Sequence, residues 1–588
     1  MEGLDRLEKH WRWWLLLFWV AAAAGLIFSK WAAIRQFGLP DTDDNIRIME
    51  VRAWLGGQSW YDLRQYRLNP PSGADVHWSR LVDIPIAGLK LALTPFLGGA
   101  SAEKAAVTIA PLLPLGVAMA AVATIARRLI APSAFALAIA VLLCAHSPRA
   151  MWTPLRIDHH GWQLAFLAWA VAGLIDPKRA RGGAVLGLAT ALSVAIGLEM
   201  LLYLATLGAI AVVLWIRDPA EGRRLITYGG TLAGGTGLAY LLFASWANRA
   251  PVCDALSPVW LSGLVGAGAV AALLALLPLR SVPLRFAAAA AAGVVVAAGF
   301  ALAWPHCLGR LENVSPEATR LWLDNVREAR PIYMHGTQTM LIVCALPVAG
   351  LVGYAAMLWR SRREPELLVR WAAVAAPALL AAALLLWQAR AGPAAQLLAV
   401  PGATALAWLL IPKLMGSRMM LVRVLGTVAA FMLVSGLLPQ QLAQYIPQKP
   451  RPVLKTVNRA NGLCWSLWGL HPVALVPKGQ VLTHVDLGPR LIAVTHHDAV
   501  AGPYHRNGKD IVDVMMAFRG SADFAREVVA RRKIDYVLVC PGMSETTIYA
   551  SQAKNGFYVQ LMKGQVPAWL ETVPLPKDSP FRMWRVRR

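Results

Sequence analysis

The hydrophobic pattern of the chain consists of long apolar runs separated by short polar segments. Long apolar runs, such as 287–304 and 379–387, contain no charged residue. A helix needs about 20 apolar residues to cross a bilayer, and on this basis the sequence predicts about thirteen membrane-spanning helices. The predicted spans are 13–28, 104–125, 133–147, 162–175, 183–196, 202–216, 225–246, 259–277, 286–304, 339–358, 368–387, 394–411 and 419–438. The weaker apolar stretch 84–97, which Lys90 and prolines interrupt, is predicted to be a re-entrant or interfacial helix.

The polar segments predict the orientation and the domains. Lys and Arg gather in alternate short loops, which the positive-inside rule places in the cytoplasm together with the N-terminus. The long loop 29–83, the loop 305–338 and the tail 439–588 then lie outside, in the periplasm if the membrane is a bacterial inner membrane. We therefore predict a transmembrane domain over 1–438 and a periplasmic domain over 439–588. The tail alternates apolar runs, such as 533–540, with helical stretches at 510–518 and 522–531, which favours a mixed α/β domain.

The composition excludes several classes of protein. Of the 588 residues, 57% are hydrophobic and 15% are charged, which is unlike a soluble enzyme, a disordered chain or a disulfide-rich miniprotein. The formal net charge of +24 fits basic cytoplasmic loops beside membrane lipids rather than nucleic-acid binding. The six cysteines form no CxxC pair. Cys253 and Cys307 both fall in predicted outer loops, where a disulfide is chemically permitted, and the sequence leaves that pairing open.

Acidic residues gather in three predicted outer loops at the membrane edge. The loops read Asp41-Thr-Asp-Asp-Asn-Ile-Arg47, Arg156-Ile-Asp-His-His-Gly161 and Asn325-Val-Arg-Glu-Ala-Arg-Pro331. Carboxylates beside hydrocarbon are costly unless they are paired or bound to a cation. Carboxylates that converge with an imidazole suit Mg²⁺ or Mn²⁺. The alternative is that these acids are solvated, or that Asp44 pairs with Arg47.

In their order along the chain, these motifs resemble the catalytic subunit of oligosaccharyltransferase, a member of the GT-C superfamily of polyprenol-dependent glycosyltransferases. The resemblance implies a polytopic GT-C fold of about thirteen helices, with a C-terminal mixed α/β domain outside. It implies that Asp43, Asp158, His160 and Glu328 bind a divalent metal, that Asp43 or Glu328 is catalytic, and that Arg390 contacts the phosphate of the donor. Asp41, Asp44 and His159 are further candidates beside these positions.

The tail departs from the family pattern. The family motif Trp-Trp-Asp-Tyr-Gly, which binds the Asn-x-Ser/Thr acceptor, is matched by the stretch 481–488, where His484 and Val485 replace both tryptophans. We assign acceptor binding to His484 and Asp486. Because the tryptophans are missing, we expect an acceptor other than an Asn-x-Ser/Thr sequon: a hydroxyl on a protein, a glycan or a lipid.

The sequence therefore predicts an inverting, metal-assisted glycosyltransferase that uses a polyprenyl phosphate or diphosphate donor. One alternative is transfer of a single sugar from a polyprenyl monophosphate to lipopolysaccharide or a surface polymer. The other is a transporter or flippase for a polar lipid, which would also contain many spans and buried charges. Two residues keep two interpretations each. Glu199 either faces the donor or makes a structural hydrogen bond, and Arg80 either lines the cavity or forms a salt bridge with Asp83.

Overall fold

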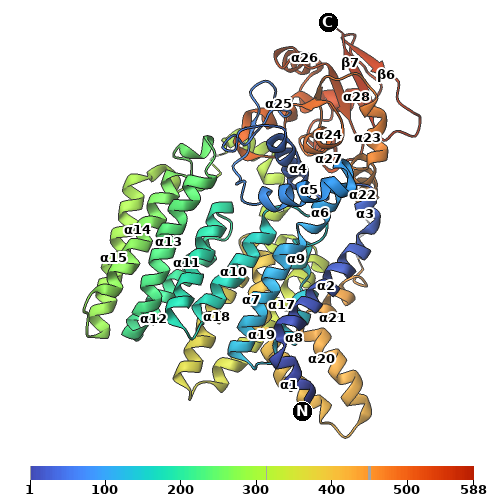
Figure 1. Ribbon diagram of the computed structural model, residues 1–588. Coiled ribbons are helices and arrows are strands. Elements are labelled where there is room, and N and C mark those ends of the chain that lie inside the picture. Colours follow the sequence, from blue (N-terminus) through green and yellow to red (C-terminus); the bar gives the residue numbers. More distant parts are fainter. Residues whose placement is uncertain (1, 313, 448–451, 588) are drawn as a thin grey trace.

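The structure is a computed structural model that describes residues 2–312, 314–447 and 452–587. It consists of a tall helical bundle with the C-terminal part of the chain seated on one end (Figure 1). The N-terminus lies at the opposite end, and α2 (Trp11–Ser29) runs along the bundle toward the C-terminal part. Helices dominate this region because a helix satisfies all of its backbone hydrogen bonds internally, as a bilayer requires.

Within the described ranges, eight helices are long and apolar enough to cross a membrane, or nine if one bent pair counts as a single span. They are α2, α6 with α7 (Gly99–Leu129), α11 (Arg179–Ile196), α14 (Pro258–Leu276), α15 (Val282–Ala303), α17 (Thr337–Arg360), α18 (Pro365–Leu384), and η7 with α19 (Ala389–Met415); the bent pair is Val422–Val434, which includes α20 (Thr427–Val434), with α21 (Leu437–Ala443). The chain is therefore a multi-pass helical membrane protein, as predicted.

The count of about thirteen spans stays a prediction. Several of the predicted spans form helices that are short for a full crossing: α8 (Phe135–Cys144), α10 (His160–Leu174) and α12 (Leu201–Arg217) have 10, 15 and 17 residues. The predicted span 225–246 forms α13 (Gly222–Phe243), which is long enough but rich in glycine and threonine.

Glycines allow the closest helix contacts in the bundle. A Cβ atom built on Gly183 of α11 would lie 2.0 Å from the carbonyl oxygen of Arg224 in α13. A Cβ atom on Gly353 of α17 would lie 1.9 Å from the carbonyl oxygen of Gly402 in α19. Small residues allow helix backbones to approach without a hydrophobic driving force, which the lipid does not supply between apolar helices.

We name the end of the bundle that carries the C-terminal part the outer end; the long first loop and the segments around it form this end. The predicted interfacial helix forms α5 (Asp83–Leu97), which lies with α4 (Thr42–Leu55) at this end (Figure 1). Further elements before the C-terminal part are α1 (Glu2–Lys9), α3 (Trp31–Arg35), β1 (Arg64–Gln65), β2 (Ala74–Asp75), α9 (His146–Ala150), η1 (Pro219–Glu221), η2 (Ala247–Arg249), η3 (Pro305–Cys307), α16 (Pro316–Leu321), η4 (Leu323–Asn325), η5 (Arg327–Ala329) and η6 (Ile332–Met334).

The C-terminal part contains a five-stranded mixed sheet of strand order β4-β3-β5-β7-β6. Strand β3 pairs in parallel with β4 and β5, whereas β7 pairs antiparallel with β5 and β6. The mixed α/β character predicted for the tail is thus present. The elements are α22 (Pro452–Cys464), α23 (Leu467–Ala474), β3 (Gln480–Leu482), α24 (Gly488–Val494), β4 (Asp498–Ala499), η9 (His505–Asn507), α25 (Gly508–Arg519), α26 (Ala522–Arg531), β5 (Tyr536–Val539), α27 (Ser544–Gln552), α28 (Phe557–Met562), β6 (Leu570–Val573) and β7 (Arg582–Val586).

One hydrophobic core joins the first outer loop to the C-terminal part. Ile46 and Ile48 of α4 belong to the same buried cluster as Leu487 and Leu491 of the tail. The fully buried Arg490 crosses this junction, where its guanidinium donates to the carbonyl oxygen of Phe37 at 3.0 Å. The contact fixes the N-terminal end of α4 against the tail.

Two disulfides tie segments of the outer end. Cys253 pairs with Cys307, with their Cα atoms 5.4 Å apart, which resolves the pairing that the sequence left open. Cys464 pairs with Cys540, with their Cα atoms 6.4 Å apart. The second pair was not predicted, since neither cysteine lies near a recognisable motif.

Candidate functional site

The first part of the site is the N-terminal turn of α4. Asp41 caps this helix, because its carboxylate accepts a hydrogen bond from the backbone N–H of Thr42 at 2.7 Å. Asp43 and Asp44 follow in the first turn. Carboxylates are favoured there by the free N–H groups and by the positive end of the helix dipole. The local sequence thus places three acids at one helix end.

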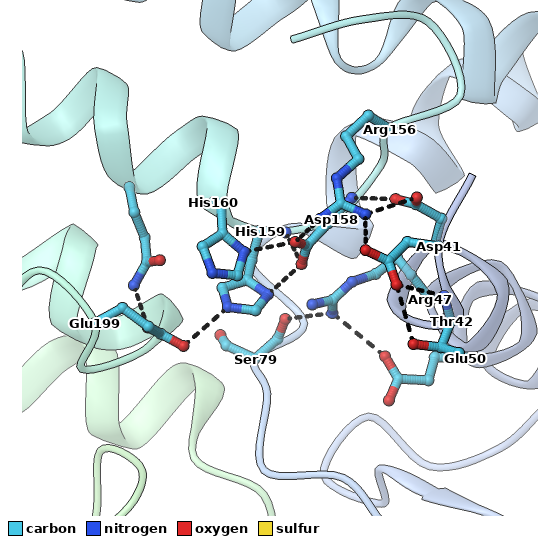
Figure 2. Close-up of polar contacts among 12 residues, drawn as sticks. Asp41, Thr42, Arg47, Glu50, Ser79, Arg156, Asp158, His159, His160 and Glu199 are labelled. Carbon is cyan, nitrogen blue, oxygen red and sulfur yellow. Dashed lines mark hydrogen bonds and ion pairs between the residues drawn. The ribbon is translucent and has the colours of Figure 1, made fainter. Parts of the chain in front are cut away.

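The second part is the segment that leads into α10, where Arg156 is the hub (Figure 2). One of its terminal nitrogens, Nη1, contacts Asp41 at 2.6 Å and Asp44 at 3.1 Å, and the other, Nη2, contacts Asp158 at 3.2 Å. The backbone N–H of Asp158 also donates to Asp44 at 3.0 Å. Two loops that are more than 100 residues apart are thereby joined, and their acids share one guanidinium.

Two histidines flank the Asp158 carboxylate. Its Oδ1 lies 2.5 Å from Nδ1 of His159, and its Oδ2 lies 2.5 Å from Nδ1 of His160. The other ring nitrogen of His159 lies 3.0 Å from Glu199, which also accepts a hydrogen bond from Gln163 at 2.7 Å (Figure 2). Glu199 is therefore structurally paired and also belongs to the group around Asp158.

The group holds more negative than positive charge at its α4 side. Burial raises the pKa of the Asp43 carboxyl well above its ordinary value, and the charges of Asp158 and Asp41 raise it further. Burial also raises the pKa of Asp44 to about 7, although Arg156 opposes that rise. Carboxyls whose pKa is raised, and which lie beside an ionised carboxylate, are placed where a bound cation would favour their ionised form.

The Asp158 side of the group has the opposite character. Burial raises the pKa of Asp158, but the charges of His159, His160 and Arg156 outweigh burial and hold that pKa well below its ordinary value. Burial lowers the pKa of His159, but the charges of Asp158 and Glu199 outweigh it and raise the pKa to about 9. Asp158 is therefore ionised at neutral pH and is the strongest anionic ligand that the group offers.

The geometry and donor types fit a divalent cation. The ligand atoms of Asp158, His159 and His160 all lie within 4.8 Å of one another. Asp43 is close enough to Asp158 for the charge of Asp158 to raise the pKa of Asp43. A set of carboxylate oxygens with imidazole nitrogens suits Mn²⁺ or Zn²⁺ better than Mg²⁺, which prefers oxygen ligands.

The structure does not bring Glu328 or Arg390 to this group. Glu328 is exposed on η5, which contacts η7 (Ala389–Ala391) through the hydrogen bond from the N–H of Ala389 to the carbonyl oxygen of Arg330 at 2.8 Å. Arg390 lies on η7, where it contacts Glu312 at 3.5 Å and Gln388 at 2.5 Å. These two predicted residues thus share a separate neighbourhood on the outer loops.

A pocket of about 580 Å³ opens beside the α4 end of the group. Asp41 and Thr42 line it from the first loop, and Trp465 and Asp486 line it from the tail. Of the two tail residues predicted to bind the acceptor, Asp486 therefore faces the pocket. Burial raises the pKa of Asp486 to about 6, and the charge of Asp41 adds to the rise.

His484 lies in the core of the C-terminal part, outside the lining of this pocket. It is fully buried, and its Nε2 accepts a hydrogen bond from the backbone N–H of Cys540 at 3.0 Å. Burial lowers the pKa of His484 to about 3, so its ring is neutral. Glu545, which sequence reasoning missed, accepts hydrogen bonds from the backbone N–H groups of Val485 and Asp486 at 3.0 Å each and so holds the loop that carries Asp486.

A buried ion network lies beneath the site. Arg80 contacts Asp83 at 3.2 Å, so the structure bears out the salt bridge rather than the cavity-lining interpretation. Arg47 contacts Asp83 at 3.0 Å and Glu50 at 3.3 Å, so it does not pair with Asp44 as the alternative from the sequence supposed. The alternating charges along α4 are a sequence signal for this network. Asp83, which pairs with Arg47, lies in α5, so the signal in α4 does not reveal it.

The comparisons with known proteins concern the fold. No protein-family model matches the sequence, and the search of curated proteins found no match. Among solved structures, the chain is similar to the archaeal oligosaccharyltransferase AglB from Archaeoglobus fulgidus in complex with an inhibitory peptide and a dolichol-phosphate. The TM-score is 0.68 at 15% identity, over 96% of this chain and 73% of that chain.

Two further structures of the Archaeoglobus fulgidus oligosaccharyltransferase match similarly. The enzyme tethered to an acceptor peptide with the NVT sequon gives a TM-score of 0.66 at 14% identity, over 95% of this chain and 72% of that chain. Its complex with Zn and sulfate gives 0.61 at 14% identity, with the same coverage.

The chain therefore shares the fold of the Archaeoglobus fulgidus oligosaccharyltransferase, a fold of the GT-C type, over nearly its whole length. The fold that the sequence motifs implied is confirmed.

Proposed function

We propose that this protein is a membrane glycosyltransferase that transfers a sugar or oligosaccharide from a polyprenyl phosphate or diphosphate to a hydroxyl acceptor. The observation that carries the proposal is the group of Asp43, Asp44, Asp158, His159 and His160, which two distant loops bring together in a GT-C fold. A complex of the similar AglB contains dolichol-phosphate, which supports a polyprenyl-linked donor here.

A divalent cation completes this proposed site. Asp43, Asp158 and His160 are the residues that would hold it, with Asp44 and His159 beside them. When bound, such an ion neutralises the phosphate leaving group and orients the acceptor. The similar oligosaccharyltransferase forms a complex with Zn and sulfate, which supports metal binding here; of the two metals that the sequence predicts, Mg²⁺ and Mn²⁺, we propose Mn²⁺ because the donor set includes imidazole.

The residues of the chain would divide the chemistry as follows. The acceptor oxygen attacks the anomeric carbon on the face opposite the phosphate, and the bond from that carbon to the phosphate oxygen breaks with its electron pair on the phosphate. Asp43, in the ionised form that a bound cation would favour, takes the proton of the acceptor hydroxyl. Arg156 keeps the surrounding carboxylates in place, and the anomeric configuration is inverted.

We place the acceptor in the pocket that Asp41 and Asp486 line. Asp41 belongs to both the pocket and the carboxylate group, so an acceptor in this pocket lies beside the proposed base. Arg390 and Glu328 would act on the donor phosphate and on the acceptor from the neighbouring loop 305–338. Their role requires that loop to approach the group during the reaction.

The placement in the membrane follows from charge and redox chemistry. Ion pairs join Arg128 to Asp176 and Arg179 to Asp218, so several basic loops share one end of the bundle. The two disulfides belong to the other end, where the tail lies, and disulfides persist in oxidising compartments. We propose an inner-membrane protein with a cytoplasmic N-terminus, a transmembrane domain over 1–438 and a periplasmic domain over 439–588.

The test uses the full-length protein in detergent with a radiolabelled polyprenyl-linked sugar from the membranes of its own cells. We expect release of polyprenyl phosphate or diphosphate by the wild type, and at least a 100-fold slower release by Asp43→Asn and Asp158→Asn. Asp523→Asn, which changes an exposed acid of α26, is the matched control and should release at the wild-type rate. A donor that stays intact with wild-type protein while it crosses the bilayer of vesicles would establish a transporter instead.

A further inference from the structure

A second group of potential metal ligands lies on the outer end of the molecule. His77 follows β2 in the first outer loop, Asp254 lies between η2 and α14, and His505 begins η9 in the tail. One ligand atom from each residue lies within 4.8 Å of the others. Nε2 of His505 is 2.6 Å from Oδ2 of Asp254, and the rings of His77 and His505 have centroids 4.6 Å apart.

The backbone around this group is already fixed. Asn507 hydrogen-bonds both the N–H and the carbonyl oxygen of Asp75 at 3.0 Å, which ties η9 to the strand before His77. Asn248 donates to the carbonyl oxygen of His77 at 3.1 Å, which ties the third segment to the first. The disulfide of Cys253 anchors the residue next to Asp254. A ligand would therefore meet three side chains that need little ordering.

The charge of the group favours a cation. Arg506 binds both oxygens of Asp254, at 2.8 and 2.7 Å, and also contacts Asp75 at 3.2 Å. Two carboxylates therefore face one guanidinium, which leaves a net charge of about −1 when the imidazoles are neutral. The ring of His77 makes no hydrogen bond within the described ranges, so both of its nitrogens are available.

We propose that His77, Asp254 and His505 form a Zn²⁺ site that clamps three outer segments together, separate from the group around Asp158. Two imidazole nitrogens and one carboxylate oxygen are typical ligands of Zn²⁺, with water in the fourth position. Ligand bonds of about 2.0–2.1 Å put the ligand atoms of a tetrahedral site about 3.3 Å apart, within the spread of this group. Arg506 would remain on the carboxylate and orient it, as partners of metal-bound carboxylates do.

The experiment measures zinc binding by the full-length protein in detergent, after chelator treatment, in competition with a chromophoric chelator. The Asp158→Asn variant removes the other group from the measurement. We expect it to bind one equivalent of Zn²⁺, and expect Asp158→Asn with His77→Gln to bind about 100-fold more weakly. Asp158→Asn with His146→Gln, which changes an exposed histidine outside both groups, is the matched control and should bind like Asp158→Asn alone.

His77→Gln leaves every hydrogen bond around the site in place, so the metal-free variant should melt at the temperature of its parent. His505→Gln, which changes the ligand in the tail, should weaken zinc binding in the same way as His77→Gln. If Asp158→Asn is not obtained as folded protein, the same loss of one equivalent is expected when His77→Gln is made in the wild type. Zinc binding of unchanged affinity in both histidine variants would overturn the proposal, and so would an Asp158→Asn protein that binds no zinc.

Discussion

Replacing Arg156 by glutamine tests the electrostatics of the candidate site most sharply. The guanidinium contacts three carboxylates, at 2.6, 3.1 and 3.2 Å, and only 13% of its side chain is exposed. Removing one partner of a buried ion pair costs about 3–5 kcal/mol, since the remaining charges are left uncompensated. Without the guanidinium, the pKa of Asp44, already about 7, should rise further. A protonated Asp44 carries no charge, and this lowers the cost of losing Arg156.

The consequence for activity has a defined sign. A site that needs ionised carboxylates loses activity when their pKa rises, and regains part of it when the pH is raised above that pKa. We expect Arg156→Gln to reduce donor cleavage at pH 7 by about 100-fold, which corresponds to about 3 kcal/mol at 1.4 kcal/mol for each factor of 10. Raising the pH to 9 should restore part of this activity in the variant and little in the wild type.

The assay is release of labelled polyprenyl phosphate or diphosphate over a range of pH. Arg149→Gln is the control, since Arg149 lies in α9 and its side chain makes no ion pair or hydrogen bond within the described residues. It should follow the wild-type profile. Wild-type activity in Arg156→Gln, or a loss that is the same at every pH, would refute the reasoning.

Three further outcomes are expected. Without reductant, thiol alkylation of the denatured protein should label only two of the six cysteines, and all six after reduction; labelling of Cys464 and Cys540 before reduction would contradict the second disulfide. Gly183→Leu should lower the melting temperature by several degrees because its side chain has no room against α13, whereas Gly230→Ala, which meets nothing within 4 Å, should not; equal melting of the two variants would count against the packing. Glu328→Gln should slow donor cleavage at saturating acceptor by at least tenfold if the outer loop approaches the site, and an unchanged rate would remove this residue from the mechanism.

The helical part of the fold was predictable because an apolar run long enough to cross a bilayer has few alternatives to a helix. The tail was predictable in outline, since its apolar stretch 533–540 became β5 and its amphipathic stretches became α25 and α26. The number of membrane-spanning helices was harder to predict from the sequence. Helices such as α8 are short, and the packing of their neighbours decides their depth, which hydropathy does not report.

The candidate site was only partly predictable from the sequence. Asp43 and Asp158 could be placed together only through the resemblance to a family, because the hub Arg156 reaches Asp41 across 115 residues and no local pattern encodes that distance. The same resemblance placed His484 at the acceptor, but the structure buries it beneath the loop that Asp486 occupies. A motif position does not report which way the replacing side chain faces.

The most direct test of the central claim is the dependence of donor cleavage on Mn²⁺ in metal-stripped protein. The account predicts that the stripped wild type is inactive, that Mn²⁺ restores it, and that Asp158→Asn needs at least 100-fold more Mn²⁺ for half-maximal activity. Full activity of the stripped wild type, or the same Mn²⁺ requirement in Asp158→Asn, would contradict it.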